Sequence, residues 1–194
     1  ALGALVDHGR PKGKAQLLGS APPPAEEVLD AARQQAQLPG AVFGGGHVAS
    51  ATARVAKECD LRVWVCDQRV EHASAAAHPA ADACFALPWQ ESVAKVGQAQ
   101  HHYLVVVTRG HKDDEEALFR IWESGCQPKY LGMIGSRAKK VQLDRILADR
   151  GVPEPWLAAV KTPMGLDIGA KSSGEIAVSL VAELVRLRRQ GRLQ

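Results

Sequence analysis

The sequence predicts an α/β fold built on a doubly wound parallel sheet, and three observations lead to this prediction. Short apolar runs alternate along the chain with stretches of helix-forming residues, as in a parallel sheet covered by helices. The cluster Gly44-Gly45-Gly46 stands between the first apolar run and the first helical stretch, as in a dinucleotide-binding βαβ unit. The run His101–Thr108 ends in a continuous apolar, β-branched series that suits a strand buried on both faces. We therefore expect a Rossmann-like nucleotide-binding domain over residues 39–194.

Residues 1–38 are predicted to form a short N-terminal arm and a helix ahead of that domain. The first 20 residues show no sustained period, and Ala21-Pro22-Pro23-Pro24 is typical of an extended, stiff spacer. Ala25–Gln37 is rich in good helix formers, has acidic residues in its first turn and ends before Pro39-Gly40. One helix is therefore expected before the first strand.

Strands and helices are then expected to alternate to the end of the chain. The predicted strands are Ala41–Phe43, Leu61–Cys66, His101–Thr108 and Lys129–Ile134, and the last residues of the run Asp82–Leu87 could form a further short strand. The predicted helices are Ser50–Cys59, a piece opening at Pro88, Asp113–Ser124, a helix capped by Ser136 that runs to Arg150, and Ser172–Arg189. Trp156–Thr162 is ambiguous, and Pro163–Gly169 is predicted to be a glycine-punctuated loop.

Composition and charge exclude several classes of function. The net charge is +3 and aromatic residues make up 5% of the chain, so a basic, stacking surface for nucleic acid is not indicated. No apolar stretch approaches the ~20 residues that span a bilayer, and no secretory signal is recognisable, so we expect a cytoplasmic protein without membrane contact. The four cysteines form no C-x-x-C pair, which predicts neither a zinc site nor a disulfide framework.

The glycine cluster predicts a pyrophosphate site. Gly44 would allow the tight turn, Gly46 would let the backbone approach the phosphates, and Ala49 would pack the helix against the strand. The phosphates would lie on free amide groups at the positive end of the helix dipole. The candidate ligand-binding residues of this segment are Gly44, Gly45, Gly46, His47 and Val48. For His47, contact with a phosphate oxygen and a simple capping role stay equally open.

Asp67 and Arg69 follow the second strand and are candidates for the adenosine end of a ligand. An acidic residue at this distance from the glycines accepts hydrogen bonds from ribose hydroxyl groups. Asp67 would repel a 2′-phosphate, which favours NAD or another adenine dinucleotide over NADP, whereas Arg69 could contact a phosphate or a ring edge. The alternative is a helix-capping aspartate beside a solvated arginine.

Two further groups are predicted to reach the same edge of the sheet. Thr108, His111 and Asp114 follow the central strand and could bind a polar ligand edge or relay a proton. Ser136 and Arg137 begin the next helix and could form a second anion site, although Ser136 is also an ordinary helix cap. No nucleophile with an evident base and no zinc ligand cluster accompanies them, so a binding factor is favoured over an enzyme.

Six short motifs occur in one order between residues 40 and 187. They are Phe43–Ala49, Asp67 with Arg69, Thr108 with His111 and Asp114, Gly132–Arg137, Pro163–Ala170, and Glu175–Ser179 with Ala182 and Glu183. In these motifs the chain resembles the Rossmann domain of the XdhC/CoxI family. Six matches in the family's order are far more specific than a lone glycine motif.

The resemblance implies an accessory or maturation factor for a molybdenum hydroxylase of the xanthine dehydrogenase type. It implies that the ligand is molybdenum cofactor (molybdopterin), delivered in sulfurated form, and that the partner is the apo molybdenum hydroxylase. A sulfurtransferase and a second copy of this chain are further candidate partners. Full-length family members also have an N-terminal domain with a glycine-rich, cysteine-bearing motif, which Ala1–Gln37 does not resemble. We therefore expect that domain to be missing here, truncated, or carried by a different chain.

Two other functions remain open on the sequence alone. One is an NAD-dependent oxidoreductase with His111 as acid or base, although only the short front arm is left to bind a substrate. The other is a regulatory domain that senses a nucleotide and reports it through a partner.

Overall fold

The structure is a computed structural model that describes residues 39–97 and 103–190, all of which belong to one unit, Gln35–Gln194. The predicted arm and helix of residues 1–38 lie outside the described residues, as do His101 and His102 of the predicted central strand. The boundary placed at residue 38 therefore stays a prediction.

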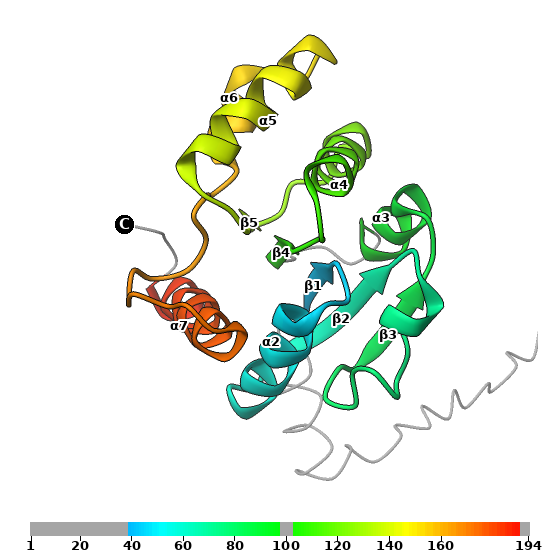
Figure 1. Cartoon of the computed structure of the whole chain (residues 1–194), viewed down its shortest axis with the longest axis vertical. Coiled ribbons are helices and arrows are strands. Elements are labelled where there is room, and N and C mark those ends of the chain that lie inside the picture. Colours follow the sequence, from blue (N-terminus) through cyan, green and yellow to red (C-terminus); the bar gives the residue numbers. More distant parts are fainter. Residues whose placement is uncertain (1–38, 98–102, 191–194) are drawn as a thin grey trace, which may run out of the picture. The chain divides into compact units, whose positions relative to one another are not determined.

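A sheet of five parallel strands forms the centre of the domain, which confirms the predicted fold class (Figure 1). The strands are β1 (Pro39–Phe43), β2 (Arg62–Asp67), β3 (Ala83–Ala86), β4 (Tyr103–Val106) and β5 (Tyr130–Met133). Their order is β3-β2-β1-β4-β5, so the strand order reverses between β1 and β4. In this register Val42 of β1 lies opposite Val65 of β2 and Val105 of β4. Such a reversal is where open α/β sheets bind ligands.

Helices cover both faces of the sheet. They are α2 (His47–Glu58), α3 (Trp89–Gly97), α4 (His111–Glu123), α5 (Arg137–Asp149), α6 (Glu154–Ala159) and α7 (Ser173–Gln190), with a 3-10 turn η1 (Val70–His72). One face packs against α2 and α7, and the other packs against α3, α4 and α5 (Figure 1). No helix in residues 39–97 or 103–190 is long and apolar enough to cross a membrane.

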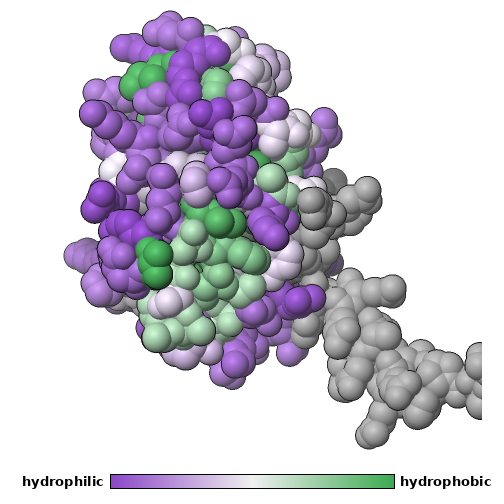
Figure 2. Space-filling model, turned by 90° about the vertical axis from the view of Figure 1, so that its right-hand side faces the viewer, coloured by the Kyte–Doolittle hydropathy of each residue, from purple (hydrophilic) through white to green (hydrophobic). Residues whose placement is uncertain are grey.

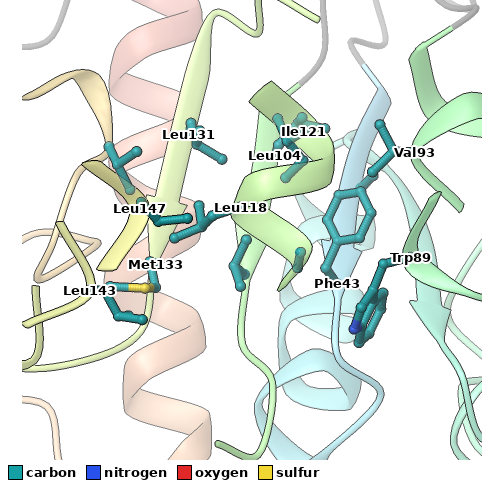
Figure 3. Close-up of a cluster of buried hydrophobic side chains, with 14 of the residues drawn as sticks. Phe43, Trp89, Val93, Leu104, Leu118, Ile121, Leu131, Met133, Leu143 and Leu147 are labelled. Atoms are coloured by element: carbon teal, nitrogen blue, oxygen red, sulfur yellow. The ribbon is translucent and has the colours of Figure 1, made fainter. Parts of the chain in front are cut away.

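Alternate side chains of each strand build the two cores. Phe43, Leu104 and Met133 point to the same face, where Trp89, Leu118 and Leu147 of three helices pack against them (Figure 3). The intervening residues, including Val42 and Val105, face α2 and α7 and belong to the second core. Because a parallel strand is buried on both faces, its sequence is a continuous apolar run, as β4 illustrates with four buried residues in succession.

Two details differ from the sequence prediction. Helix α2 begins at His47, three residues before the predicted start, because a glycine serves as its N-cap and no polar capping residue marks the boundary. The ambiguous stretch Trp156–Thr162 overlaps the short helix α6, which begins after Pro153 and carries a second proline in its first turn. The following residues align with β5, where Lys161 pairs with Gly132 as an isolated parallel bridge.

On one side of the domain, hydrophobic residues gather in an area bordered by hydrophilic residues (Figure 2). This is the right-hand side of Figure 1, where β3 is the outer strand of the sheet. All four residues of β3 are partly exposed, in contrast to the fully buried β4. Within the described residues, the two edges of the sheet therefore differ: no segment pairs with the outer side of β3, whereas Lys161 forms a bridge with Gly132 of β5.

Candidate functional site

The predicted site residues all lie at one edge of the sheet, near its carboxyl ends. Gly44 follows β1, Asp67 ends β2, Thr108 follows β4, and Ser136 follows β5. Since the five strands are parallel, their carboxyl ends meet at one edge, and β1 and β4 are neighbours there. The tertiary structure thus brings together segments that are up to about 90 residues apart in the chain.

Gly44 occupies a position that only glycine fits. Its φ angle is +111°, and a Cβ atom there would lie 2.6 Å from the carbonyl oxygen of Val107. Its amide group donates a hydrogen bond of 2.8 Å to the carbonyl oxygen of Cys66. The tight turn expected of the first glycine is present, and it is held from both neighbouring strands.

The 3-10 turn η1 packs directly against Gly45. A Cβ atom at Gly45 would lie only 1.7 Å from the carbonyl oxygen of His72, in η1. Its amide group donates a hydrogen bond of 2.8 Å to Oδ2 of Asp67. The sequence pattern gives this glycine no separate role, because nothing in the motif indicates that η1 approaches it.

Gly46 forms the open start of α2. It is the N-cap residue, no side chain caps the helix, and no acidic residue lies in the first turn. A Cβ atom at Gly46 would meet nothing within 4 Å, whereas Ala49 one turn later is fully buried against the sheet. His47 is exposed at the first helical position. The N-terminus of α2 therefore presents unpaired amide groups and the positive end of a helix dipole to its surroundings.

Asp67 is buried, and its carboxylate is fully engaged. Oδ2 accepts from the Gly45 amide group and from Nη2 of Arg69, both at 2.8 Å. Oδ1 accepts from Nε of Arg69 at 2.9 Å and from the Arg69 amide group at 3.0 Å. Burial raises the pKa of Asp67, but the hydrogen bonds from Arg69 and Gly45 together lower it more, so the net pKa lies below its ordinary value.

This pairing bears on how a ribose could bind. A carboxylate offers about four acceptor positions, and Asp67 already uses four hydrogen bonds. A ribose hydroxyl group must therefore replace one contact from Arg69, whose side chain is 28% exposed and can move into solvent. A contact between Asp67 and a ribose therefore stays a prediction, and it requires that Arg69 give up at least one of its hydrogen bonds to Asp67.

Thr108 and Asp114, two of the predicted ligand-binding residues, contact each other inside the protein at the end of β4. Asp114 is completely buried, and its Oδ1 accepts a hydrogen bond of 2.6 Å from the Thr108 hydroxyl group. The ammonium group of Lys139, from α5, forms an ion pair with Oδ2 of Asp114. His111 is exposed at the first position of α4. The buried carboxylate positions Thr108 and ties α4 to α5.

Ser136 and Arg137 have different roles at the start of α5. The Ser136 hydroxyl oxygen accepts a hydrogen bond of 3.2 Å from the Lys139 amide group, so Ser136 is an ordinary N-cap. Arg137 is exposed and borders a cavity of about 760 Å³. The cavity lies between the end of β5, the loop of residues 162–170 and α7, and none of the residues Gly44–Val48 lines it.

A buried network around Glu183 forms one wall of that cavity. Oε2 of Glu183 accepts from the Tyr130 hydroxyl group at 2.8 Å and from the Gly165 amide group at 2.7 Å. Oε1 accepts from the Lys161 ammonium group at 2.6 Å. Burial and, next, the carboxylate of Glu183 raise the pKa of Tyr130 far above its ordinary value. Glu183 itself has no exposed surface.

Sequence reasoning does not assign these residues to a site. Glu183 stands out only as part of a motif, and Tyr130, Lys139, Lys161 and Arg186 belong to no predicted ligand site. One signal is available: Glu183 stands beside Leu184 on the apolar stripe of the last helix, where a charged residue needs a buried partner. Its partners cannot be found in this way, because they lie 18 to 53 residues away in the chain.

The described residues offer no metal site, and burial makes two of their thiols less acidic. No group of three histidine, cysteine or acidic residues within them could hold a metal ion. Burial raises the pKa of the Cys66 thiol to about 12, and burial also raises the pKa of Cys126. Both thiols are therefore held in the unreactive protonated form at neutral pH.

A family model matches most of the chain. Residues 41–184 match the family described as the XdhC Rossmann domain. The match extends from β1 into the last helix and thus includes the glycine turn, Asp67 and Glu183.

Two proteins and one solved structure are similar to this chain. It is 29% identical to the "Uncharacterized protein YqeB" of Escherichia coli, over 76% of the chain and 27% of that protein. It is 26% identical to a Bacillus subtilis protein described as a "probable xanthine dehydrogenase" subunit, over 77% of the chain and 42% of that protein. A crystal structure described as a xanthine dehydrogenase from Bacillus halodurans has the same fold, with a TM-score of 0.66 and 24% identity over 80% of this chain and 44% of the other. The chain spans less than half the length of each.

Proposed function

We propose that this chain, which belongs to the XdhC Rossmann-domain family, is the nucleotide-binding part of an accessory factor for a molybdenum hydroxylase of the xanthine dehydrogenase type. The Bacillus subtilis relative, whose name refers to xanthine dehydrogenase, supports an association with such a system. Because that relative is more than twice as long as the matched region, the role of the longer protein enters here as part of the proposal.

The observation that carries the proposal is the glycine turn at the start of α2. Gly44 and Gly45 are held by neighbouring backbone, while Gly46 borders open space and α2 has neither a capping side chain nor an acidic first turn. By contrast, α4 has Asp113 and Asp114 in its first turn, and a serine caps α5. Of these three helices, α2 is the one whose N-terminus best accommodates an anion.

The ligand we propose carries a pyrophosphate group. The amide groups from Gly46 to Val48 would hold it, with His47 at its edge, and an adenosine ribose would extend toward Asp67 once Arg69 moves aside. NAD or another adenine dinucleotide satisfies these requirements. A molybdenum cofactor in dinucleotide form has the same pyrophosphate and could bind on the same amide groups.

A binding role fits these residues better than independent catalysis. Among the described residues at this edge, Asp114 is buried and paired with Thr108 and Lys139, so it is not open to a substrate. His111 is exposed, and Asp114 forms its hydrogen bond and its ion pair with Thr108 and Lys139 instead. The domain would then hold its ligand and present it to the apo-hydroxylase, with a sulfurtransferase as a further partner.

Calorimetric titration of the purified protein with NAD, ADP and molybdopterin dinucleotide tests the ligand. We expect Gly46→Val to abolish binding with the fold intact, because a Cβ atom there meets no protein atom within 4 Å, whereas the side chain blocks the approach of the phosphates. The matched control is Gly110→Val, at the N-cap of α4, where a side chain also meets nothing within 4 Å. Equal affinity in wild type and Gly46→Val would contradict the pyrophosphate site.

Reconstitution tests the accessory role. We expect the ligand-loaded protein to activate an apo molybdenum hydroxylase, and Gly46→Val to lose that effect while Gly110→Val keeps it. Hydride transfer from bound nicotinamide to a carbonyl substrate, without activation of the apoenzyme, would instead identify an oxidoreductase.

A further inference from the structure

We propose that the cavity beside α7 is a second ligand site, separate from the glycine turn, for a phosphate or carboxylate group carried on a flat apolar body. The cavity has a volume of about 760 Å³, which is within the usual range for sites that bury a small organic molecule. It opens between the end of β5, the loop before α7 and α7 itself. Nothing in the proposed function uses it.

The walls of the cavity are apolar on one part and cationic on another. Ile134, Met164 and Ile176 supply aliphatic surface on which a planar ring can pack. Arg137, Lys161 and Arg186 supply positive charge. Such a combination of a broad apolar wall with a few charged groups is typical of sites for small molecules that have one charged end.

Arg186 has a guanidinium group whose hydrogen-bonding capacity is not fully used within the described residues. Its side chain is 29% exposed, and its Nε atom is buried without a hydrogen-bond acceptor among the described residues. Its contact with Glu183 is long, at 3.9 Å, which exceeds hydrogen-bond distance. A guanidinium group has five donors arranged as a fork that matches a phosphate or carboxylate group. The hydroxyl oxygen of Thr162, also on the cavity wall, is likewise buried and lacks a partner in the described chain.

The balance of charge agrees with an anionic ligand. The carboxylate of Glu183 is already matched by the ammonium group of Lys161 at 2.6 Å. The other charged residues of the lining are Arg137 and Arg186, which are positive, and Asp167, which is negative. The lining therefore carries a net charge of about +1. The buried Tyr130 and Glu183 support this wall from behind, because they hold Gly165 and Lys161 in place.

The site is distinct from the glycine turn. Gly44 follows β1, whereas the cavity lies at the end of β5, and β4 stands between those two strands. At about 4.8 Å per strand, the two sites are separated by roughly 10 Å or more across the sheet. None of residues 44–48 lines the cavity, and neither do Asp67 and Arg69, so the two proposed sites share no residue.

Titration with flavin mononucleotide and riboflavin tests the proposal, because the two probes share a planar ring system and only the first has a phosphate group. We expect flavin mononucleotide to bind with a dissociation constant below about 1 mM and riboflavin to bind about tenfold more weakly. Perturbed amide signals in a ¹⁵N-labelled sample should lie in residues 162–170 and not in residues 44–48.

Charge-removing variants then identify the residues that hold the phosphate. Arg186→Met should weaken flavin mononucleotide about tenfold or more, and Arg137→Met, at an exposed position that tolerates substitution, should act in the same direction. Arg189→Met removes the same charge from an exposed site on the same helix and should have no effect. Gly46→Val should leave the affinity unchanged, so that failure of the nucleotide site is distinguishable from failure of this one.

Three results would overturn the proposal. The first is the absence of flavin mononucleotide binding up to about 1 mM. The second is an affinity that Arg137→Met and Arg186→Met both leave unchanged. The third is a loss of flavin mononucleotide in Gly46→Val, with perturbed signals at residues 44–48, which would assign the probe to the glycine turn.

Discussion

Arg69 binds the carboxylate of Asp67 through two parallel hydrogen bonds, Nε to Oδ1 at 2.9 Å and Nη2 to Oδ2 at 2.8 Å. The two residues stand two positions apart, so the pair forms within a single turn after β2. The same carboxylate also holds the Gly45 amide group. Asp67 therefore stabilises the glycine turn, and a ribose of the proposed ligand would have to compete with Arg69 for this carboxylate.

Acid should weaken the fold through Asp67. Its folded pKa lies below the unfolded value of 3.8, so the contribution to stability is complete above that value and is lost as pH falls through the folded pKa. Urea denaturation from neutral pH down to this range measures the effect. We expect the curve for Asp67→Asn to lie lower at neutral pH and to approach that of the wild type in acid. Parallel curves would mean that Asp67 does not carry this dependence.

Adenosine ligands should bind less tightly when Asp67 is removed. We expect Asp67→Ala to lower the affinity for ADP by about 1–3 kcal/mol, the usual loss when one partner of a buried hydrogen bond is removed. Calorimetric titration measures it, with Asp113→Ala as the control, because Asp113 is a partly exposed carboxylate at the same edge of the sheet. An unchanged affinity in Asp67→Ala would assign Asp67 to the fold alone.

Neighbouring glycines should differ sharply in their tolerance of alanine. Gly45→Ala places a Cβ atom 1.7 Å from the carbonyl oxygen of His72, and we expect it to lower the free energy of unfolding by about 1–3 kcal/mol or more. Gly46→Ala meets no atom within 4 Å and should stay within about 1 kcal/mol of the wild type. Chemical denaturation of the two variants provides the comparison, and similar losses would contradict the packing of η1 on Gly45.

Loss of Lys139 should leave a buried charge without its partner. Asp114 is completely buried, so Lys139→Met is expected to lower the free energy of unfolding by about 3–5 kcal/mol. The double variant Asp114→Asn with Lys139→Met should recover part of this loss, because the uncompensated charge is gone. If the losses of unfolding free energy in Lys139→Met and in Asp114→Asn simply add up to the loss in the double variant, the two residues are not coupled.

Two buried tyrosines should respond differently to removal of the hydroxyl group. Tyr130 donates a hydrogen bond of 2.8 Å to the buried Glu183, so Tyr130→Phe should cost about 1–3 kcal/mol of the free energy of unfolding. Tyr103 lies in the adjacent strand and is equally buried, but its hydroxyl group has no hydrogen-bond partner among the described residues. Tyr103→Phe should therefore change the unfolding free energy little in a urea titration. A larger loss of unfolding free energy in Tyr103→Phe than in Tyr130→Phe would contradict the role of Tyr130 in the Glu183 network.

Most of the fold follows from local patterns in the chain. The apolar runs of β1, β2 and β4 and the helix at residues 111–123 lie where propensity and periodicity place them. Gly44 was predictable for the same reason, because strand, tight turn and helix are consecutive in sequence. The start of α2 was less well defined, because a glycine N-cap gives no polar signal. Helix α6 is only 6 residues long and falls below the length at which a periodic pattern is distinctive.

The arrangement of the polar side chains depends on contacts between distant segments. Sequence alone places Asp67, Thr108 and Ser136 at the carboxyl edge, because parallel strands share that edge. It does not reveal that Arg69 forms hydrogen bonds with Asp67. Nor does it reveal that the buried Asp114 pairs with Thr108 and Lys139, or that Glu183 of α7 accepts a hydrogen bond from Tyr130 of β5. Turn chemistry and periodicity act over a few residues, whereas burial of a charge depends on which helix packs against which strand. The cavity beside α7 has the same origin, since its walls come from segments that meet only in the folded chain.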